Sequence, residues 1–266
     1  MTEENVLLAS VTNGIATLTL NQPKSINALS EKMLAALQGK WEKIAQNRSI
    51  KVVVLRGAGA NFCAGHNLKE MTARRADADG GHAYFKALFA TCSTMMTSII
   101  RLPQPVIAEV RGIATAAGCQ LVASCDLAVA AETARFATSG VNIGLFCSTP
   151  MVALSRKVGR KHAMEMLLLG EFITAPRAYE IGLVNRVVPE AELEATTQAL
   201  AETIADKSSL AVKMGKEAFY KQTEMDLDAA YALTGQVMAE NMLARDAERG
   251  IRAFIDKQKM PEWSGT

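Results

Sequence analysis

The amino-acid sequence predicts an α/β protein that ends in an all-helical region. Short aliphatic runs that suit buried strands alternate with helical stripes over most of the chain. Two of these strands, within 51–71 and 106–131, lead into glycine- or alanine-rich turns that open a helix. From Glu192 onward the pattern is helical only. We therefore expect a core over residues 1–204 and a helical region over 205–266.

The first elements predict a β-α-β unit. A strand follows the turn Asn13-Gly14, and the polar loop NQPKSINALS separates this strand from a helix. Ser30 is the expected N-cap of the helix, which ends near Asn47. The aliphatic run 52–55 suits a strand that is buried on both faces. Because a helix connects the two strands, we expect them to pair in parallel.

The alternation continues through the middle of the chain. The polar, glycine-broken segment 72–83 predicts a mobile surface loop. A strong helical stripe follows over 85–100, and the strand 106–110 leads to the second turn, whose residues up to Gly118 are all small. The helix after this turn precedes a strand over 126–131. Small residues allow either the close approach of a ligand or tight packing of helix on sheet, and both interpretations stay open.

The remaining sequence predicts short connections and then helices. Residues 132–148 suggest loops and short extended pieces, Thr149-Pro150 begins a helix, and 183–188 forms the last strand. Helices follow over 191–206, 209–221, 226–244 and 246–258. These helices carry more apolar residues than one buried face needs. We interpret the surplus as a subunit-packing surface, and a helical cap on the chain's own core is the alternative.

The composition argues against several classes of protein. Among 266 residues, 29 basic and 27 acidic side chains leave a net charge of +2, and the aromatic content of 5% disfavours nucleic-acid binding. No apolar run approaches the length of a membrane span. The N-terminal MTEENVLLAS is acidic and lacks the apolar stretch of a signal peptide. The five cysteines are unclustered, which argues against zinc and for a reducing compartment, so we expect a cytoplasmic, metal-free protein.

The first turn offers a place where negative charge could be held. A strand-turn-helix arrangement leaves the backbone N–H groups of the first helical turn without partners. An ordinary strand-to-helix connection is the alternative for the same residues. Gly57-Ala58-Gly59 also looks like the start of a dinucleotide-binding fingerprint, but Phe62 stands where the third glycine is required. We therefore do not expect nicotinamide or flavin binding.

Four segments together resemble the crotonase superfamily of enoyl-CoA hydratases and isomerases: NQPKSINALS, FCAGHNLKEM, ATAAGCQLVASCDLAVA and EFITAPRAYEIGLVNRVVP. The resemblance covers nearly the whole chain. It implies a crotonase-like spiral of ββα units with a C-terminal helical trimerisation region, assembled as a homotrimer or a dimer of trimers. The implied substrate is an acyl-CoA thioester, whose oxygen two backbone N–H groups hold as it becomes an enolate. Carried onto this sequence, the donors of this oxyanion hole are the amides of His66 and Ala117, and the His66 imidazole has a packing or positioning role.

The same resemblance implies a binding surface for the substrate and no cofactor beyond the coenzyme A of the substrate itself. Lys257 and Lys259 would reach a coenzyme A phosphate that is held mainly by a neighbouring subunit. The complete set of expected substrate-binding residues is Pro23, Lys24, Ala64, His66, Asn67, Leu68, Lys257 and Lys259.

The sequence departs from the family at both catalytic carboxylates. Hydratases of this family use two glutamates to activate water and to deliver a proton, and Gln120 and Gly140 stand in their places. An amide does not exchange a proton near neutral pH, and glycine has no side chain. The polar residues nearby are poor general bases without an activating partner; they are Thr138, Ser139, Asn142, Cys147 and Ser148.

Two functions therefore stay open. The first is a lyase or isomerase of the enoyl-CoA hydratase type that works through a thioester enolate. Its hydration activity would be lower than that of a two-glutamate enzyme by at least ~10³. The alternative is a non-catalytic acyl-CoA binder or regulator that kept the pocket. A serine hydrolase is disfavoured because the sequence has no nucleophile-elbow pattern.

Overall fold

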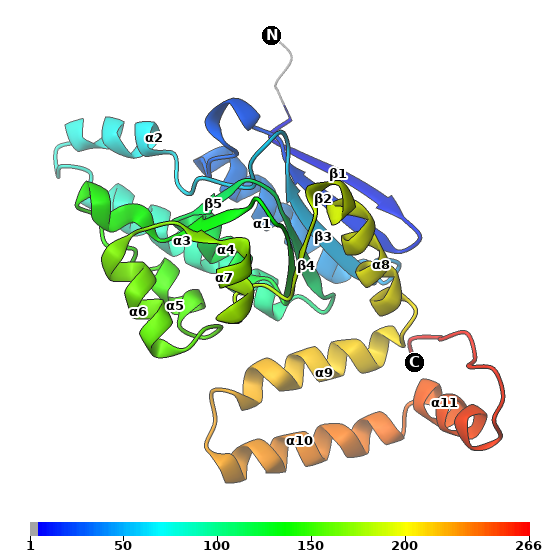
Figure 1. Ribbon diagram of the computed structural model, residues 1–266. Helices are drawn as coiled ribbons and strands as arrows, with labels where there is room; N and C mark the ends of the chain where they lie inside the picture. Colours follow the sequence, from blue (N-terminus) through cyan, green and yellow to red (C-terminus); the bar gives the residue numbers. More distant parts are fainter. Residues whose placement is uncertain (1–4) are drawn as a thin grey trace.

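The computed structural model describes residues 5–266, and Figure 1 shows an α/β core from which a group of helices extends. The larger sheet has six strands in the order β1-β2-β3-β4-β6-β9, and a smaller sheet has the order β5-β7-β8. The strands are β1 (Leu7–Thr12), β2 (Ile15–Leu20), β3 (Val52–Gly57), β4 (Val106–Val110), β5 (Ile113–Thr115), β6 (Leu127–Ala131), β7 (Arg135–Ala137), β8 (Ile173–Thr174) and β9 (Arg186–Val188).

Helices follow most of the strands, as the alternating pattern predicts. Those of the core are α1 (Glu31–Gln46), α2 (Leu68–Ala73), α3 (His82–Arg101), α4 (Ala117–Ser124), α5 (Pro150–Leu154), α6 (Arg160–Leu169), α7 (Ala175–Glu180) and α8 (Leu193–Ala205). The C-terminal helices are α9 (Ser209–Gln222), α10 (Leu227–Met242) and α11 (Arg245–Ile255). Short 3₁₀ turns are η1 (Pro23–Ser25), η2 (Arg74–Ala76), η3 (Ser139–Ile143) and η4 (Glu190–Glu192).

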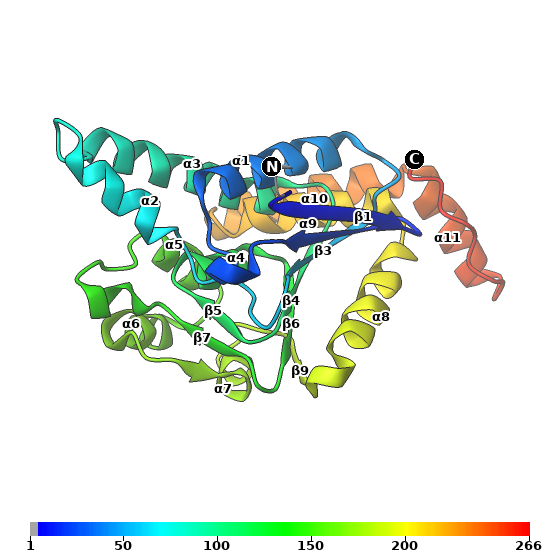
Figure 2. The ribbon, with the colours of Figure 1, turned by 90° about the horizontal axis from the view of Figure 1, so that it is seen from above.

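The predicted β-α-β unit is confirmed. Strands β2 and β3 pair in parallel with Ile15 opposite Val52, and α1 connects them. Side chains alternate across β3, so Val53 packs in the main core whereas Val52 and Val54 lie in the cluster with α8. Figure 2 shows α8 on one side of the sheet and α4 and α5 on the other. Coverage of both faces explains why these strands read as continuous aliphatic runs rather than as alternating ones.

Helix α1 begins and packs as its sequence predicts. The Ser30 hydroxyl accepts a hydrogen bond from the Met33 amide at 3.1 Å, which satisfies one of the free donors of the first turn. The apolar stripe of this helix, which includes Met33 and Trp41, is buried in the main core. Such a cap contributes about 1 kcal/mol to stability.

The segment 72–83 differs from the predicted surface loop. Helix α2 and η2 occupy its first part, and α3 already begins within it. The Arg74 guanidinium lies 5.0 Å from the ring centroid of Tyr84, and that of Arg75 lies 5.9 Å from the ring centroid of Phe85. These cation–π contacts with residues later in the chain order a segment whose own composition is polar.

Two further boundaries differ from the prediction. The last strand begins at Arg186, because the Leu183 and Val184 amides both donate to the Ala178 carbonyl, at 2.8 and 3.3 Å, and so close the end of α7. Helix α5 begins after Thr149 as predicted, but the Thr149 side chain makes no capping hydrogen bond. The small β5-β7-β8 sheet was not predicted, because its strands are two or three residues long.

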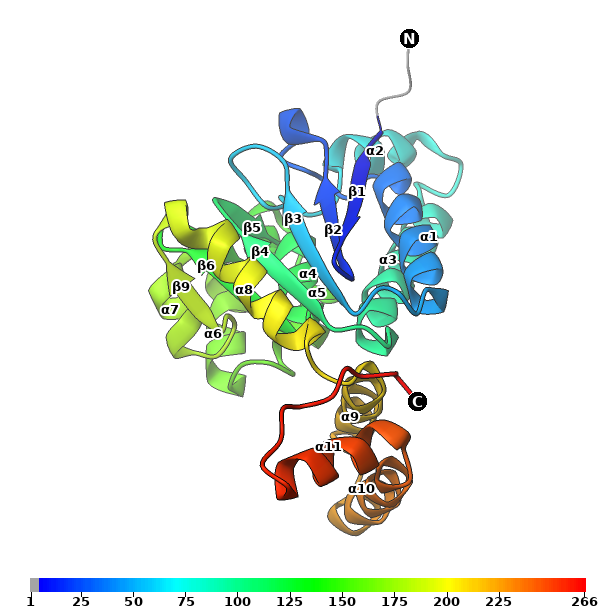
Figure 3. The ribbon, with the colours of Figure 1, turned by 90° about the vertical axis from the view of Figure 1, so that its right-hand side faces the viewer.

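Helices α9 and α10 pack against each other and extend away from the sheet (Figures 1 and 3). Helix α9 is tied to the core by Lys216, whose Nζ donates to Asp126 Oδ2 at 2.7 Å, and by Tyr220, whose hydroxyl donates to Asp126 Oδ1 at 2.9 Å. Helix α8 ends at Ala205 and α9 begins at Ser209, which is close to the expected boundary between 204 and 205. That division into two units stays a prediction.

The C-terminal tail folds back onto the helical region through Asp246. Its carboxylate accepts hydrogen bonds from the Ser208 hydroxyl at 2.7 Å, from the Ser264 amide and hydroxyl at 2.8 Å each, and from the Gly265 amide at 2.9 Å. Burial by itself would raise the pKa of this carboxyl, but the four donors outweigh burial and lower the pKa to about 2. Asp246 therefore joins α11, the start of α9 and the tail.

Large apolar side chains are exposed on α10 and after it. The exposed fraction is 72% for Tyr231, 88% for Leu243 and 74% for Phe254. This distribution agrees with the apolar surplus noted in the sequence. No helix in residues 5–266 is both long and apolar enough to cross a membrane.

Candidate functional site

The two predicted turns meet at the carboxyl ends of β3 and β4. The Cys63 amide donates to the Ile113 carbonyl at 3.0 Å, and the Thr115 amide donates to the Cys63 carbonyl at 3.0 Å. Gly118 lies so close to the Cys63 carbonyl that a Cβ at position 118 would clash with that backbone oxygen. The small residues of the second turn thus allow backbone to pack on backbone, which is one of the two interpretations that the sequence left open.

The loop NQPKSINALS joins the two turns as a third segment. The Ala64 amide donates to the Ile26 carbonyl at 3.0 Å, and the Leu29 amide donates to the Gly65 carbonyl at 2.7 Å. The buried Asn27 side chain donates to two carbonyls of the first turn. Ile26 and Asn27 have φ of 53° and 51°, an uncommon region for residues other than glycine and especially for a β-branched one. The loop therefore holds a strained backbone against the first turn.

These contacts bring the amides of His66 and Ala117 together. A Cβ on Gly65, the residue before His66, would stand 3.1 Å from the Ala117 nitrogen. Within residues 5–266, neither amide donates a hydrogen bond. Ala117 is the first residue of α4, so the helix itself supplies no acceptor for its N–H. Ala116 before it has φ 50° and ψ −120°, a conformation that costs on the order of 1–3 kcal/mol in a residue with a side chain.

The His66 imidazole packs between the first turn and α3. Its ring meets the ring of Phe89 edge-on, with 5.6 Å between the centroids. Both ring nitrogens are buried and lack a hydrogen-bond partner among the described residues. Burial lowers the pKa of His66, with the Leu29 backbone acting in the opposite direction, so the ring is neutral near pH 7. A neutral ring at this place packs without adding a charge to the site.

Gln120 lies one helical turn after Ala117, about 4.5 Å along the axis of α4. Its side chain is 4% exposed, and its Oε1 atom has no hydrogen-bond partner within the part of the chain that the structure describes. The same side chain forms part of the wall of a large cleft. Gln120 therefore presents a buried amide toward the cleft, and its correspondence with a catalytic glutamate stays a prediction.

Gly140 lies in η3 and is closed in by the loop that follows it. The Leu145 amide donates to the Gly140 carbonyl at 2.9 Å. A Cβ on Gly140 would overlap the Leu145 carbonyl oxygen and would stand 2.9 Å from Cys147 Sγ. Burial raises the pKa of the Cys147 thiol, opposed by a hydrogen bond from the Gly140 backbone, so this sulfur is no thiolate near neutral pH. Neighbouring atoms thus fill the space that a side chain at position 140 would need, and the correspondence of Gly140 with a second glutamate stays a prediction.

The structure groups most of the expected substrate-binding residues and separates two of them. Pro23 and Lys24 lie in η1 and are exposed, next to the segment 64–68 that the loop contacts. The Asn67 side chain caps α2 and is therefore occupied. Lys257 and Lys259 lie beyond the end of α11, at the opposite side of the molecule from α2 (Figures 1 and 2). Within one chain these two lysines do not approach the turns.

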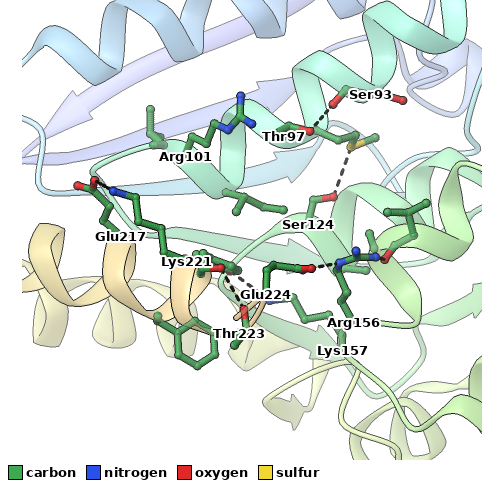
Figure 4. Close-up of a pocket in the computed structure, with 18 of the residues that line it drawn as sticks. Ser93, Thr97, Arg101, Ser124, Arg156, Lys157, Glu217, Lys221, Thr223 and Glu224 are labelled. Carbon is green, nitrogen blue, oxygen red and sulfur yellow. Dashed lines mark hydrogen bonds and ion pairs between the residues drawn. The ribbon is translucent and has the colours of Figure 1, made fainter. Parts of the chain in front are cut away.

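The sequence did not reveal the cleft itself, which lies between α3, α4, α5 and α9 and has a volume of about 1280 Å³. Figure 4 shows side chains from these helices around it. Its walls combine apolar and charged residues, and the charged ones come from α9 and the turn after it, from the end of α3 and from the segment after α5. The sequence does not indicate this cleft, because the apolar stripe over 85–100, which contributes Met96 and Ile100 to its wall, has the pattern of an ordinary core helix. No group of three or more His, Cys, Asp and Glu side chains suited to a metal ion gathers anywhere in residues 5–266.

Comparison with known proteins agrees with the predicted fold and family. A family model for enoyl-CoA hydratase/isomerase matches residues 10–266. The chain is 49% identical over 252 residues to the human enoyl-CoA hydratase domain-containing protein 3, covering 95% of this chain and 81% of that one. A solved enoyl-CoA hydratase from Mycobacterium smegmatis superposes with a TM-score of 0.93 at 52% identity, covering 97% of this chain and 99% of that one. This chain belongs to the enoyl-CoA hydratase/isomerase family, and its fold is the crotonase fold that the sequence predicts.

The expected cytoplasmic location is contradicted. The similar proteins from human, Xenopus laevis and mouse are all named as mitochondrial. The prediction rested on scattered cysteines and an acidic N-terminus. A reduced mitochondrial matrix is as compatible with free cysteines as the cytoplasm is, so cysteine usage could not separate the two compartments.

Proposed function

We propose that this protein binds acyl-CoA thioesters and stabilises their enolate through the amides of His66 and Ala117. The observation that carries the proposal is that these two N–H groups have no acceptor within residues 5–266. They lie on the two turns, which hydrogen bonds hold against each other and against the loop NQPKSINALS. Family membership supports the acyl-CoA class of substrate and a lyase or isomerase type of reaction.

The physical case rests on where negative charge develops. When a thioester loses a proton or a group at its α-carbon, the charge moves to the carbonyl oxygen, and donors fixed beforehand stabilise that oxygen more than they stabilise the neutral ground state. Each such donor contributes about 10²- to 10³-fold in rate. Ala117 also stands at the start of α4, where the helix dipole favours an anion. Ala116 has a strained backbone conformation, which is consistent with a turn that fixes the direction of the Ala117 N–H.

The residues at positions 120 and 140 do not support proton transfer. Gln120 cannot act as an acid or base, and Gly140 offers no side chain, so water is not activated as in a two-glutamate hydratase. We expect hydration of a short trans-2-enoyl-CoA to be slower than in such an enzyme by at least ~10³. The reaction that remains is an enolate step in which the substrate brings part of its own reactive chemistry.

The position of coenzyme A is inferred from the residues beside the two amides, in the loop NQPKSINALS and in the first turn. We propose that Pro23 and Lys24 on one side and the segment 64–68 on the other hold coenzyme A, with the thioester at the amides. We further propose a homotrimer or a dimer of trimers, in which Lys257 and Lys259 of a neighbouring subunit reach a coenzyme A phosphate. The exposed apolar side chains on α10 and α11 support this assembly. Light scattering that gives a monomer mass of 28.5 kDa would contradict it.

Two measurements on the unmodified protein test the proposal. Calorimetry with free CoA and with a short acyl-CoA should show that the thioester binds at least as tightly as CoA. Mass spectrometry of a saturated acyl-CoA in buffered D₂O should show that its α-hydrogens exchange faster with the protein than without it, because solvent base removes the proton while the two amides stabilise the enolate. No heat with either ligand at high micromolar concentration would overturn the proposal.

The second candidate is a non-catalytic acyl-CoA binder or regulator. Gln120 and the closed-in Gly140 favour it, because both positions of the acid–base pair are lost. This protein would bind the thioester and give neither α-hydrogen exchange nor turnover in a screen of CoA thioesters. Binding together with exchange would decide for the enolate-stabilising enzyme.

A further inference from the structure

The cleft between α3, α4, α5 and α9 begins next to the proposed thioester position. Gln120, Ala123 and Ser124 of α4 all belong to its wall. Ala117 and Ser124 are seven residues apart, so the wall extends about 10 Å along α4 from the level of the amides. A thioester carbonyl held at Ala117 therefore lies about one helical turn from the start of this wall at Gln120.

The apolar part of the cleft wall suits an aliphatic chain. Its residues include Met96, Ile100, Leu102, Ala123 and Ala153. Burying a methylene group among such side chains contributes roughly 0.8 kcal/mol. This part alone would favour a plain fatty acyl group.

The far part of the cleft contains a cation that lacks a carboxylate. Lys157 Nζ donates to the Tyr220 hydroxyl at 3.1 Å and lies 5.0 Å from the centre of that ring. The Tyr220 hydroxyl in turn donates to Asp126, whose charge is already paired with Lys216 at 2.7 Å. Among residues 5–266, Lys157 forms no ion pair, so two of its three N–H groups remain available. Burial lowers the pKa of Lys157, with Asp126 acting in the opposite direction, because the ammonium group is partly desolvated.

The other charges around the cleft do not neutralise it. Figure 4 shows two internal pairs, Arg156 with Glu224 at 2.9 Å and Lys221 with Glu217 at 2.7 Å. The complete charged lining consists of Arg101, Arg156, Lys157, Lys213, Lys221, Glu217 and Glu224, which leaves three positive charges in excess. Within the described chain, Arg101 and Lys213 also form no ion pair.

We propose that the cleft receives the acyl chain of the substrate and selects a chain that ends in a carboxylate, which Lys157 binds. The proposal rests on the proposed function, because it places the thioester at the two amides. An ammonium group that is partly desolvated gains more from a charged acceptor than an exposed lysine does, since water competes less. A methyl end at the same place would bury apolar atoms against an unsatisfied cation. The substrate class is then the CoA thioester of a dicarboxylic acid.

Matched ligands test this directly on the wild-type protein. Pairs of CoA thioesters with the same number of carbons, from four to twelve, differ only in whether the far end is a methyl group or a carboxylate. At the length that reaches Lys157, we expect the carboxylate-ended thioester to bind at least tenfold more tightly in calorimetry. Equal affinities within every pair would overturn the inference while the proposed function stands. Absence of binding by all thioesters would instead overturn the proposed function.

Two variants test whether Lys157 is the residue that causes the preference for carboxylate-ended thioesters. Lys157→Met should reduce the tenfold preference to less than about threefold and leave the methyl-ended thioester bound as in wild type or more tightly. Lys161→Met removes an exposed lysine that does not line the cleft and should keep the full preference. A preference that survives Lys157→Met would refute the assignment of Lys157. If that variant does not fold, Lys157→Gln also removes the charge and should reduce the preference to less than about threefold, and a preference that survives it would refute the assignment equally.

Other anions are distinguished by two further titrations. Free CoA tests whether the cleft holds the phosphates of the nucleotide, and inorganic phosphate tests whether it holds any anion. Tighter binding of free CoA by wild type than by Lys157→Met would show a phosphate subsite and overturn the acyl-end assignment. We expect inorganic phosphate to weaken the binding of carboxylate-ended thioesters only. Equal weakening of the binding of both members of a pair would contradict the inference.

Discussion

Gly140 is the position at which the structure most sharply limits this protein's chemistry. The sequence alone suggests that glutamates at positions 120 and 140 would restore a hydratase. In the structure a Cβ on Gly140 overlaps the Leu145 carbonyl oxygen and stands 2.9 Å from Cys147 Sγ. We therefore predict that even Gly140→Ala opens the loop between these residues.

The expected cost can be worked from these contacts. Opening the loop breaks the hydrogen bond from the Leu145 amide to the Gly140 carbonyl, worth about 1 kcal/mol. Overpacking of the displaced atoms adds roughly 1–3 kcal/mol. The total of roughly 2–4 kcal/mol should lower the midpoint of thermal unfolding by about 5–15 °C in a chain of this size. Glutamate, whose side chain is larger, should cost more.

The assay compares midpoints by circular dichroism at one protein concentration. Gly39→Ala is the matched control, because Gly39 lies inside α1 with no atom within 4 Å of its added Cβ. That change should raise stability by roughly 0.5–1 kcal/mol, since alanine is the better helix former. A midpoint for Gly140→Ala within about 1 °C of wild type would refute the reasoning, as would a folded Gln120→Glu/Gly140→Glu double variant with fast hydration.

Three other predictions follow from local geometry. Gly65→Ala adds a Cβ at φ 91° that stands 3.1 Å from the Ala117 nitrogen, so it should weaken acyl-CoA binding by about tenfold or more in calorimetry, whereas Gly39→Ala should not. Ala116→Gly relieves a positive φ and should raise the free energy of unfolding by up to about 1–3 kcal/mol in urea titrations, and a loss of stability would contradict the proposed strain. For Asp246, the depressed pKa of about 2 means that its roughly 2 kcal/mol of stability is present above pH 3.8 and is lost as pH falls through 2, so Asp246→Asn should flatten that acid limb of the stability curve.

Local patterns predicted the core of the fold well. The helix capped by Ser30, the buried strand 52–55 and both strand-to-helix turns depend on neighbours in the sequence, and the structure confirms each of them. The segment 72–83 was predicted less well, because its order comes from arginines that stack on later aromatic rings. The shorter last strand has a similar cause, in amides that turn back to Ala178.

The candidate site could be predicted only in part from the sequence, because it also depends on contacts between residues that are distant in the chain. The sequence points to His66 and Ala117 through the resemblance of the two turns, and their roles stay a proposal. It could not show that Gly140 is closed in by a carbonyl, which depends on how the following loop folds. Nor could it show the cleft, whose far end needs α9 docked by the contact of Lys216 with Asp126, 90 residues apart. Contacts at that separation leave no periodic signal in the chain.

The two halves of the proposed machinery depend on the sequence in different ways. The amide donors belong to the backbone, so any residue that tolerates the turn can carry one, and this is why a histidine at position 66 leaves the donor in place. An acid–base pair belongs to side chains, and under the proposed correspondence a glutamine at position 120 lacks one member of the pair within the same helix α4. At position 140 the loss goes further, because the loop has closed over the space that a carboxylate would need. Under the proposed function, a chain with these oxyanion donors and this closed space suits substrates that supply their own proton or leaving group better than the hydration of a simple enoyl chain.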